Sequence, residues 1–354
     1  MEYYDDIELD DGFQASDGEE RYERFRIRVD GGQGPLRIDK YLFDKMSGVS
    51  RTRIHHAAEY GNVEVNGVAV KSNYKVKPGD DVAVLLGYAP TDYTIVPQEM
   101  PLDVVYEDDY VLLINKPAGL VVHPGFGNRD FTLLNGIAWH LREMKDFDAN
   151  DPSIGLVHRI DKDTSGLILA AKTPAAKADL SRQFFEHSTR RTYYALVWGV
   201  LKEDEGTIEG ALARDNRDRQ IFRVWDIEEN PLAKHAVTHY KVLRRYAYCT
   251  LVECRLETGR THQIRVHMKH IGHPLFNDER YGGSEILKGL PTAKYRQFIL
   301  NCFDTCPRQA LHARTLGFRH PATGEEMDFT SDIAPDMQAL LEKWERFNPS
   351  MQGE

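Results

Sequence analysis

Polar and apolar positions near the N-terminus predict a strand followed by two short helices. Residues 24–29 alternate between polar and apolar side chains, as a half-buried strand does. Apolar residues then recur at helical spacing over 36–42, with bases on the other faces. Ser50 is suited to cap a second helix, which we expect to end at Tyr60–Gly61, where glycine favours a left-handed C-cap.

The next segment predicts a hairpin and a closing strand. Asn66–Gly67 is the strongest short hairpin signal, and a strand is expected over 81–86. We therefore expect one compact domain at 24–88, followed by a proline-containing linker at 89–100 that lacks hydrophobic periodicity.

From residue 101 onward, strand and helix patterns are mixed. Leu167–Ala171 is continuously apolar, as expected of a strand that is covered on both faces. Pro174 can occupy the first position of a helix, where its missing N–H is harmless. The other expected strands are 110–115, 192–198, 236–243 and 250–256, with a short extended piece at 119–123 and helices at 132–142 and 174–187. The pattern predicts a second domain at 101–345 and a C-terminal tail at 346–354.

The formal charge of −10 is concentrated at the N-terminus. Residues 1–20 hold nine acidic residues and no Lys or Arg, which leaves 45 basic against 46 acidic residues in the rest of the chain. Such a block is typical of a disordered tail, which we place at 1–23. It either keeps the protein in solution or competes with polyanions for a basic surface.

Cysteine usage and hydropathy indicate a cytoplasmic protein. Four cysteines are too few and too uneven for a disulfide framework, and the N-terminus lacks the basic-then-apolar pattern of a secretory signal. No apolar run is long enough to cross a bilayer. Cys302 and Cys306 have a loose metal-like spacing, but no second ligand pair accompanies them, so we expect no zinc site.

The segment His158–Gly166 concentrates groups that can do chemistry. Asp161 precedes the buried strand, on a loop where a rigid scaffold often holds a catalytic group. Asp163, Thr164 and Ser165 can fix such a loop through local side-chain-to-backbone bonds. No bidentate Glu follows at the spacing of a calcium loop. The residues alone leave two interpretations open, a plain turn and a catalytic carboxylate.

A second block at 256–268 predicts a strand, a tight turn and a helix. Thr261 can cap this helix, and His262, Arg265 and Lys269 share one side of it. An arginine in the first turn opposes the helix dipole, so an anionic partner explains it better than free exposure does. A buried pair with an aspartate would keep that aspartate ionised at neutral pH. An exposed arginine is the alternative.

Five separate blocks of the chain resemble the RluA family of pseudouridine synthases. The segment His158–Gly166 is similar to the family's signature, with Ile160 where leucine is usual. The other blocks are Tyr106–Asp108 with Asn115–Pro124, Arg191–Tyr193 (with Arg in place of Lys), Thr258–His267 and Arg308–Ala313. The resemblance implies an α+β fold with a mixed, mainly antiparallel sheet flanked by helices and loops.

The resemblance also implies roles for individual residues. Asp161 corresponds to the catalytic aspartate, Arg265 to its ion-pair partner and Tyr193 to the residue that packs on the target base. Arg159 would fill the gap that a flipped base leaves in the RNA. His158 and Arg191, beside these positions, are expected to contact RNA.

Residues 36–87 resemble an S4 RNA-binding domain. The similarity rests on Arg37–Asp39, on Ser50–Arg51 and on Gly61–Gly67. In that family a basic helical face rests on folded RNA, so phosphate contacts are expected from Arg37, Lys40, Arg51 and Arg53.

Together these resemblances imply an enzyme that converts uridine to pseudouridine in RNA, most closely the RluD-like branch that acts on large-subunit (23S) ribosomal RNA. The reaction is an isomerisation, so no metal, redox cofactor or second substrate is expected. We expect a cytoplasmic monomer with RNA as its partner and no membrane association. The alternatives are a non-catalytic RNA-binding ribosome-assembly factor and an N-glycosidase that frees uracil.

Overall fold

The computed structural model describes residues 22–46, 49, 51–59, 61–86, 95–124, 128–144, 147–150, 155–215, 218, 221–230 and 233–347. Residues 1–21 of the predicted acidic tail, Ser50, Tyr60, residues 89–94 of the predicted linker and residues 348–354 of the predicted C-terminal tail lie outside these residues. The predicted boundary of the acidic tail at residue 23 is wrong by two residues, because a strand begins at Tyr22. The chain divides into two compact units. The first comprises residues 1–94 together with 125–127, and the second comprises residues 95–124 and 128–354.

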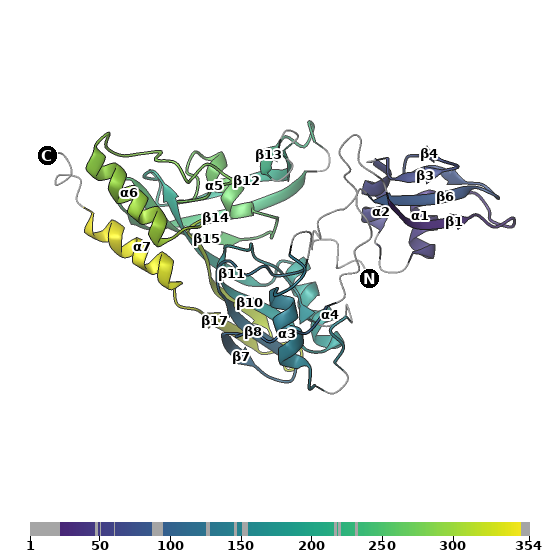
Figure 1. Cartoon of the computed structure of the whole chain (residues 1–354), viewed down its shortest axis with the longest axis horizontal. Coiled ribbons are helices and arrows are strands. Elements are labelled where there is room, and N and C mark those ends of the chain that lie inside the picture. The colour runs from purple at the N-terminus through teal and green to yellow at the C-terminus, as the bar shows by residue number, and fades with distance from the viewer. Residues whose placement is uncertain are drawn as a thin grey trace. The chain divides into compact units, whose positions relative to one another are not determined.

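The N-terminal unit is a small sheet covered by two helices (Figure 1). Its strands run in the order β1 (Tyr22–Arg28), β6 (Asp81–Leu86), β3 (Val63–Val65) and β4 (Val68–Ala69), and β2 (Leu36–Arg37) pairs with β5 (Lys75–Val76). The helices are α1 (Ile38–Lys45) and α2 (Arg51–Glu59). Ile38 and Leu42 of α1 pack with Val63 and Val82 of the sheet, which explains the helical spacing of apolar residues in this segment.

The predicted hairpin is present between β3 and β4. Asn66 and Gly67 both have positive φ, 53° and 79°, as a two-residue turn of type I′ requires. Gly61 follows α2 with φ of 71°, in agreement with a left-handed end of that helix.

The second unit is built on one mixed sheet of eleven strands. The path runs β13 (Phe222–Trp225), β12 (Glu205–Arg214), β14 (Lys234–Arg245), β15 (Cys249–Leu256), β11 (Arg190–Trp198), β16 (Leu311–Arg319), β10 (Ser165–Ala171), β8 (Val111–Lys116) and β7 (Val104–Glu107), with β17 (Glu326–Thr330) on β16 and β9 (Gly155–Leu156) on β10. Among the described strands, β10 and β16 form the one parallel pair. The mainly antiparallel sheet expected from the sequence is confirmed.

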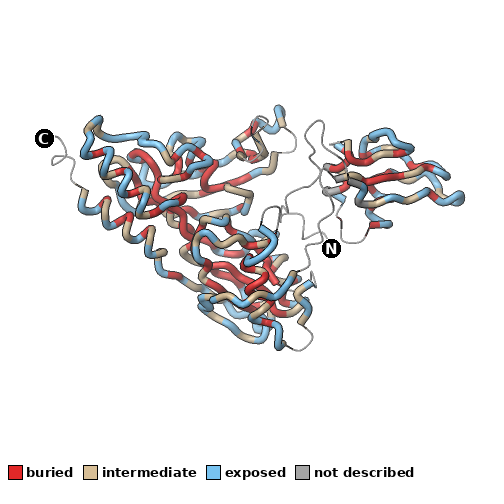
Figure 2. The backbone as a smooth tube through the Cα atoms, viewed as in Figure 1, coloured by how far each residue is buried: buried red, intermediate tan, exposed pale blue. Residues whose placement is uncertain are grey.

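Helices cover the sheet around β10. Ile168 packs in one cluster with Leu133 of α3 (Leu133–Leu141), while Leu169 packs in another with Leu180 of α4 (Pro174–Phe185). Every residue of β10 is buried, as its continuous apolar run predicts (Figure 2). The remaining helices are α5 (Gln263–His270), α6 (Ala293–Thr305) and α7 (Pro335–Arg346), of which α6 and α7 pack against each other.

The extended piece expected at 119–123 is not a strand. Gly119 has φ of 84° in a turn, and its amide donates to the carbonyl of Lys162 at 3.0 Å. The backbone of this segment therefore binds the loop that carries Asp161. The Gly119 amide hydrogen-bonds to that loop instead of to a neighbouring strand.

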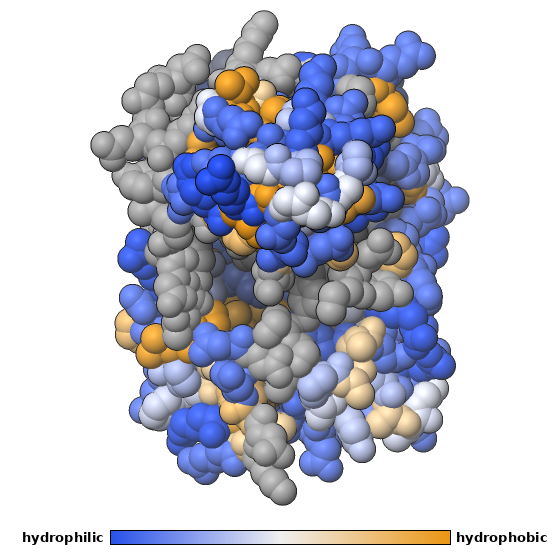
Figure 3. Space-filling view, turned by 90° about the vertical axis from the view of Figure 1, so that its right-hand side faces the viewer, coloured by the Kyte–Doolittle hydropathy of each residue, from blue (hydrophilic) through white to orange (hydrophobic). Residues whose placement is uncertain are grey.

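The surface carries no large hydrophobic area on the face drawn in Figure 3, where hydrophilic residues predominate and hydrophobic ones form small separate groups. None of the helices in the described residues has both the length and the apolar character needed to cross a bilayer.

Candidate active site

Asp161 lies on the tight turn that leads into β10. The turn closes through the amide of Thr164, which donates to the Asp161 carbonyl at 3.1 Å. The Asp161 side chain is 22% exposed, so its carboxylate is shielded but reachable from outside. Arg265 of α5 donates from Nη1 to Asp161 Oδ2 at 2.9 Å, across 104 positions of sequence.

Arg265 is held by a second carboxylate that the sequence analysis missed. Asp278 accepts from Arg265 Nε at 2.8 Å and from Nη2 at 2.9 Å, and its side chain is fully buried. Such a bidentate pair fixes the plane of the guanidinium and leaves Nη1 for Asp161. Asp278 follows α5 in an irregular segment, and no sequence spacing connects it with Arg265.

Three residues of the second motif meet at the ring of Tyr281. The cations of Arg265 and Lys269 lie 4.9 and 5.6 Å from the ring centroid, and His262 Nδ1 is 2.8 Å from the Tyr281 hydroxyl. The shared side predicted for these residues is thus present, and Tyr281 packs against it.

The predicted cap at Thr261 is wrong, because α5 begins one residue later. His262 occupies the N-cap in a left-handed conformation with φ of 54° and makes no side-chain cap bond. Its ring turns to Tyr281, and Nε2 lies 3.9 Å from Asp161 Oδ1. A non-glycine residue with this backbone is strained, and such strain is often found at functional sites.

The charges of the site keep Asp161 ionised. Burial alone raises its pKa, but His262 in its charged form, Arg265 and Arg159 outweigh burial and lower the pKa to about 2. Burial lowers the pKa of His262 to about 4, so its imidazole is neutral at pH 7. Arg265, whose own pKa is raised by the two carboxylates, is therefore the counter-charge of Asp161 at neutral pH.

The loop that carries Asp161 is tied to the sheet by Lys116 at the end of β8. Its fully buried ammonium donates to the carbonyls of Pro117, Leu120 and Lys162 at 2.8, 2.9 and 2.8 Å. Burial lowers the pKa of Lys116 to about 7, while the charge of Asp161 opposes that shift. Lys116 thereby joins the first motif of the chain to the residue beside Asp161.

Arg308 anchors the other side of the loop. It donates to the carbonyl of Asp163 at 2.9 Å and to Ser165 Oγ at 3.1 Å, and it pairs with Asp336. Ser165 Oγ also lies 2.9 Å from His312 Nδ1, whereas the buried Thr164 hydroxyl has no hydrogen-bond partner among the residues that the structure describes. The local bonds predicted for 163–165 are therefore wrong, because distant charged side chains satisfy this backbone instead.

Gly166 allows β10 to approach β16. Its φ is 111°, and a Cβ at this position would stand 2.2 Å from the carbonyl oxygen of Ala313. A side chain here would push the two strands apart and shift the loop that precedes them.

Tyr193 lies on β11 and is 7% exposed. It pairs across the sheet with Cys254 and Ala313, and it belongs to the apolar cluster that contains Ile160 and Ile264. These two residues flank Asp161 and Arg265 in the sequence, so Tyr193 stands beside the carboxylate. Burial raises its pKa, and Asp161 adds to that rise.

His158 and Arg159 face different environments. Arg159 is exposed, and its charge acts on both Asp161 and His123. His158 is 8% exposed, stacks on Phe184 with centroids 4.5 Å apart, and accepts from the amide of Leu169 at 2.9 Å. In this arrangement His158 supports the loop from inside, and its contact with RNA stays a prediction.

The expected basic face of the N-terminal unit is organised by Asp39. Arg37 and Arg51 both pair with this buried carboxylate, at 3.0 and 3.1 Å, while their own side chains stay nearly half exposed. Lys40 is exposed beside them. The side chain of Arg53 lies outside the described residues.

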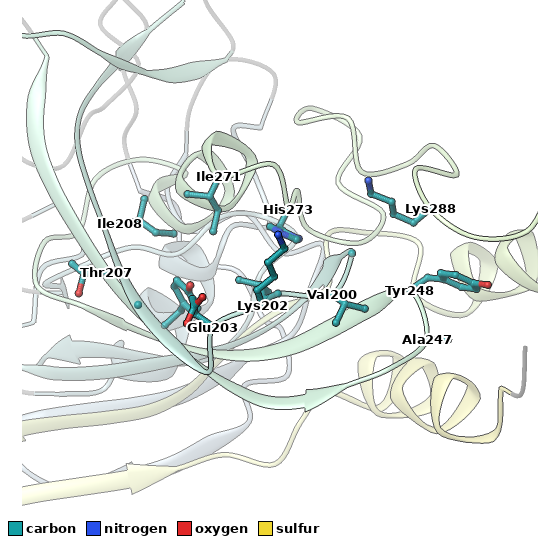
Figure 4. A pocket seen from close by; sticks show the side chains of 14 residues that line it. Val200, Lys202, Glu203, Thr207, Ile208, Ala247, Tyr248, Ile271, His273 and Lys288 are labelled. Carbon is teal, nitrogen blue, oxygen red and sulfur yellow. The ribbon is translucent and has the colours of Figure 1, made fainter.

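A separate hollow of about 660 Å³ lies away from Asp161 (Figure 4). Lys202, Tyr248, His273 and Lys288 are among the residues that line it, and none of the predicted site residues does. Among the described residues, no group of three His, Cys, Asp or Glu side chains is arranged to hold a metal ion.

Comparisons with known proteins agree on one family. Residues 110–270 match RNA pseudouridylate synthases, and residues 36–82 match the S4 domain. An "Uncharacterized RNA pseudouridine synthase" of Chlorobaculum parvum is 43% identical over 312 residues, covering 88% of this chain and 94% of that protein. A "Ribosomal large subunit pseudouridine synthase D" of Nitrosomonas europaea is 38% identical over 328 residues, covering 93% and 90%. The solved structure "Human RNA Pseudouridylate Synthase Domain Containing 1" superposes with a TM-score of 0.51 at 25% identity, covering 71% of this chain and 89% of that one.

Proposed function

The chain belongs to the family of RNA pseudouridine synthases, and from this premise we propose that it isomerises uridines of large-subunit ribosomal RNA with Asp161 as the catalytic carboxylate. The observation that carries the assignment is the Asp161–Arg265–Asp278 arrangement, a partly exposed carboxylate held ionised by a buried guanidinium. The names of relatives that match most of the chain support ribosomal RNA as the substrate.

The reaction breaks the N1–C1′ bond, rotates the uracil and joins C5 to C1′, after which C5 loses its proton and N1 gains one. Substrate and product have the same composition, so the chemistry requires no net oxidant or reductant and no second substrate. An ionised carboxylate can attack C1′, add to the uracil ring or remove the 2′ proton, and Asp161 is ionised at neutral pH for any of the three.

The target base must leave its stack before Asp161 can reach the sugar, which costs a few kcal/mol. We assign Tyr193 to pack on the flipped base, where stacking contributes about 1–3 kcal/mol. We assign the exposed Arg159 to the gap left in the RNA. In the S4-like domain at 24–88, Arg37, Lys40, Arg51 and Arg53 would contact phosphates, and the catalytic domain would span 101–345.

We further propose that the chain works as a monomer in the cytoplasm, where ribosomal RNA and its assembling particles occur.

The decisive test is tritium release from C5-labelled ribosomal RNA by the wild type, by Asp161→Asn and by the matched control Asp163→Asn. We expect release by the wild type and the control, no release by Asp161→Asn, and equal RNA binding by all three. Binding without release by the wild type would instead support a non-catalytic assembly factor. Free uracil among the products would identify an N-glycosidase.

A further inference from the structure

Arg191 on β11 is a buried cation that lacks a counter-charge. Its side chain is 7% exposed, and its Nε has no hydrogen-bond partner. Within the part of the chain that the structure describes, no carboxylate pairs with Arg191 and no oxygen accepts a hydrogen bond from its guanidinium. A guanidinium carries five N–H donors, so this one is prepared for acceptors that the folded chain does not supply.

Other arginines of the same unit show how the fold usually treats this group. Arg265 and Arg308, which are as buried as Arg191, each pair with a carboxylate at less than 3 Å. Arg190, the next residue on β11, is half exposed and pairs with both Glu326 and Asp328. Burial of a charge without a partner is costly, and it is retained where an external ligand completes the site.

The position of the guanidinium connects it with the active site. Arg191 and Tyr193 are two residues apart on β11, so they share one face of the sheet, and each affects the pKa of the other. The guanidinium lies 5.1 Å from the ring of Phe184, on which His158 stacks. It is therefore next to the base of the loop that carries Asp161.

One end of the guanidinium lies against an exposed glycine. Its Nη1 lies 3.0 Å from the point where a Cβ would stand on Gly259, in the turn before α5. Gly259 is exposed, and it has no side chain to cover this end of Arg191. A side chain at position 259 would therefore crowd the guanidinium, whereas glycine leaves this end of Arg191 beside an exposed turn.

We infer that Arg191 binds a phosphate of the RNA backbone next to the target uridine. This deepens, and rests on, the proposed function. A uracil carbonyl could accept a hydrogen bond but would leave the buried charge uncompensated, whereas a phosphodiester supplies both acceptors and a full negative charge. The contact would hold the backbone while the base turns onto Tyr193, so Arg191 acts as a positioning residue.

The test measures binding of a synthetic RNA stem–loop whose uridine the wild type converts, with Asp161→Asn as the background to prevent turnover. We expect Arg191→Gln to weaken binding by about 10- to 100-fold, as loss of a hydrogen-bonded charge does, and to lower the salt slope by about one. Arg190→Gln removes the same charge from the exposed, paired neighbour and should change both quantities little.

A methylphosphonate scan identifies the phosphate. One neutral linkage beside the target uridine should weaken binding by about 10-fold when Arg191 is present and have no further effect when it is Gln. Additive losses at every linkage would overturn the inference. The melting temperature of Arg191→Gln distinguishes phosphate binding from a role in packing. If Arg191 binds phosphate, loss of its uncompensated buried charge should leave the melting temperature unchanged or raise it. A lowered melting temperature with unchanged RNA affinity would also overturn the inference.

Failure of the proposed function gives a different result. If the wild type converts no uridine in total ribosomal RNA, that function is wrong, while the salt slopes of Arg191→Gln and Arg190→Gln on the same RNA still test the phosphate contact. Conversion by the wild type with equal slopes for both variants would contradict the Arg191 inference alone.

Discussion

Replacement of Asp161 by Asn should change the pH dependence of stability in a defined direction. The pKa of Asp161 is about 2 in the folded chain against an ordinary value of 3.8, so folding favours its ionised form. A lowered pKa contributes stability that is complete above the unfolded value and is lost as the pH falls through the folded value. The relevant window is therefore about pH 4 to 2.

The difference between the two pKa values corresponds to a contribution of about 2 kcal/mol to the free energy of unfolding at neutral pH, and about half of this contribution is lost by pH 3. Chemical unfolding at pH 7 and pH 3, followed by tryptophan fluorescence, measures it. All four tryptophans of the chain lie after residue 95, so the signal reports the second unit alone. The stability difference between the wild type and Asp161→Asn should shrink by about 1 kcal/mol between these pH values.

The matched control is Asp163→Asn, on the same loop, whose side chain makes no hydrogen bond or ion pair within the described residues. It removes one carboxylate without removing a partner of Arg265. A stability difference for Asp161→Asn that stays constant from pH 7 to pH 3, or that grows, would refute the claim that the neighbouring charges of His262, Arg265 and Arg159 hold this carboxylate ionised.

Three further changes test the supports of the site. Gly166→Ala should lower the free energy of unfolding by about 2–4 kcal/mol, because its Cβ would meet the Ala313 carbonyl. The control is Gly324→Ala, a position with positive φ but open space, which should cost only about 1 kcal/mol in the same unfolding assay. Asp278→Asn should reduce single-turnover rates by at least about 10-fold with unchanged RNA affinity, because Arg265 loses its fixed orientation; an unchanged rate would contradict this role. Arg308→Met should lower the melting temperature and the turnover rate together, since it frees the loop carbonyl of Asp163; loss of stability alone would show that the loop keeps its shape without Arg308.

The sequence predicted the parts of this molecule that depend on local pattern. The burial of β10 and the Asn66–Gly67 turn follow from an apolar run and from turn residues, and the structure has both. The mainly antiparallel sheet was implied by the family resemblance and is also present. Asp161 and Arg265 were singled out by chemistry that is unusual for their positions, a carboxylate before a buried strand and a cation at a helix start.

The supports of Asp161 could not be predicted because they act over long sequence distances. Lys116 binds the carbonyl of Lys162, 46 residues away, and Arg308 binds that of Asp163, 145 residues away. Both residues lie in blocks that resemble the family, but the local pattern of residues does not distinguish a buried anchor from a surface cation. Local reasoning also chose Thr261 as a helix cap, whereas packing of His262 against Tyr281 sets where α5 begins.

The anchoring of the loop by Arg308 has a consequence for synthesis of the chain. Asp161 is made early, but its partner Arg265 follows 104 residues later, and Arg308 and the strand that pairs with Gly166 follow later still. Contacts of such long range form late in folding, because the loops between them must first close. A nascent chain that has not yet released β16 from the ribosome would therefore lack an assembled site, so the enzyme should remain inactive until β16 has emerged and paired with β10.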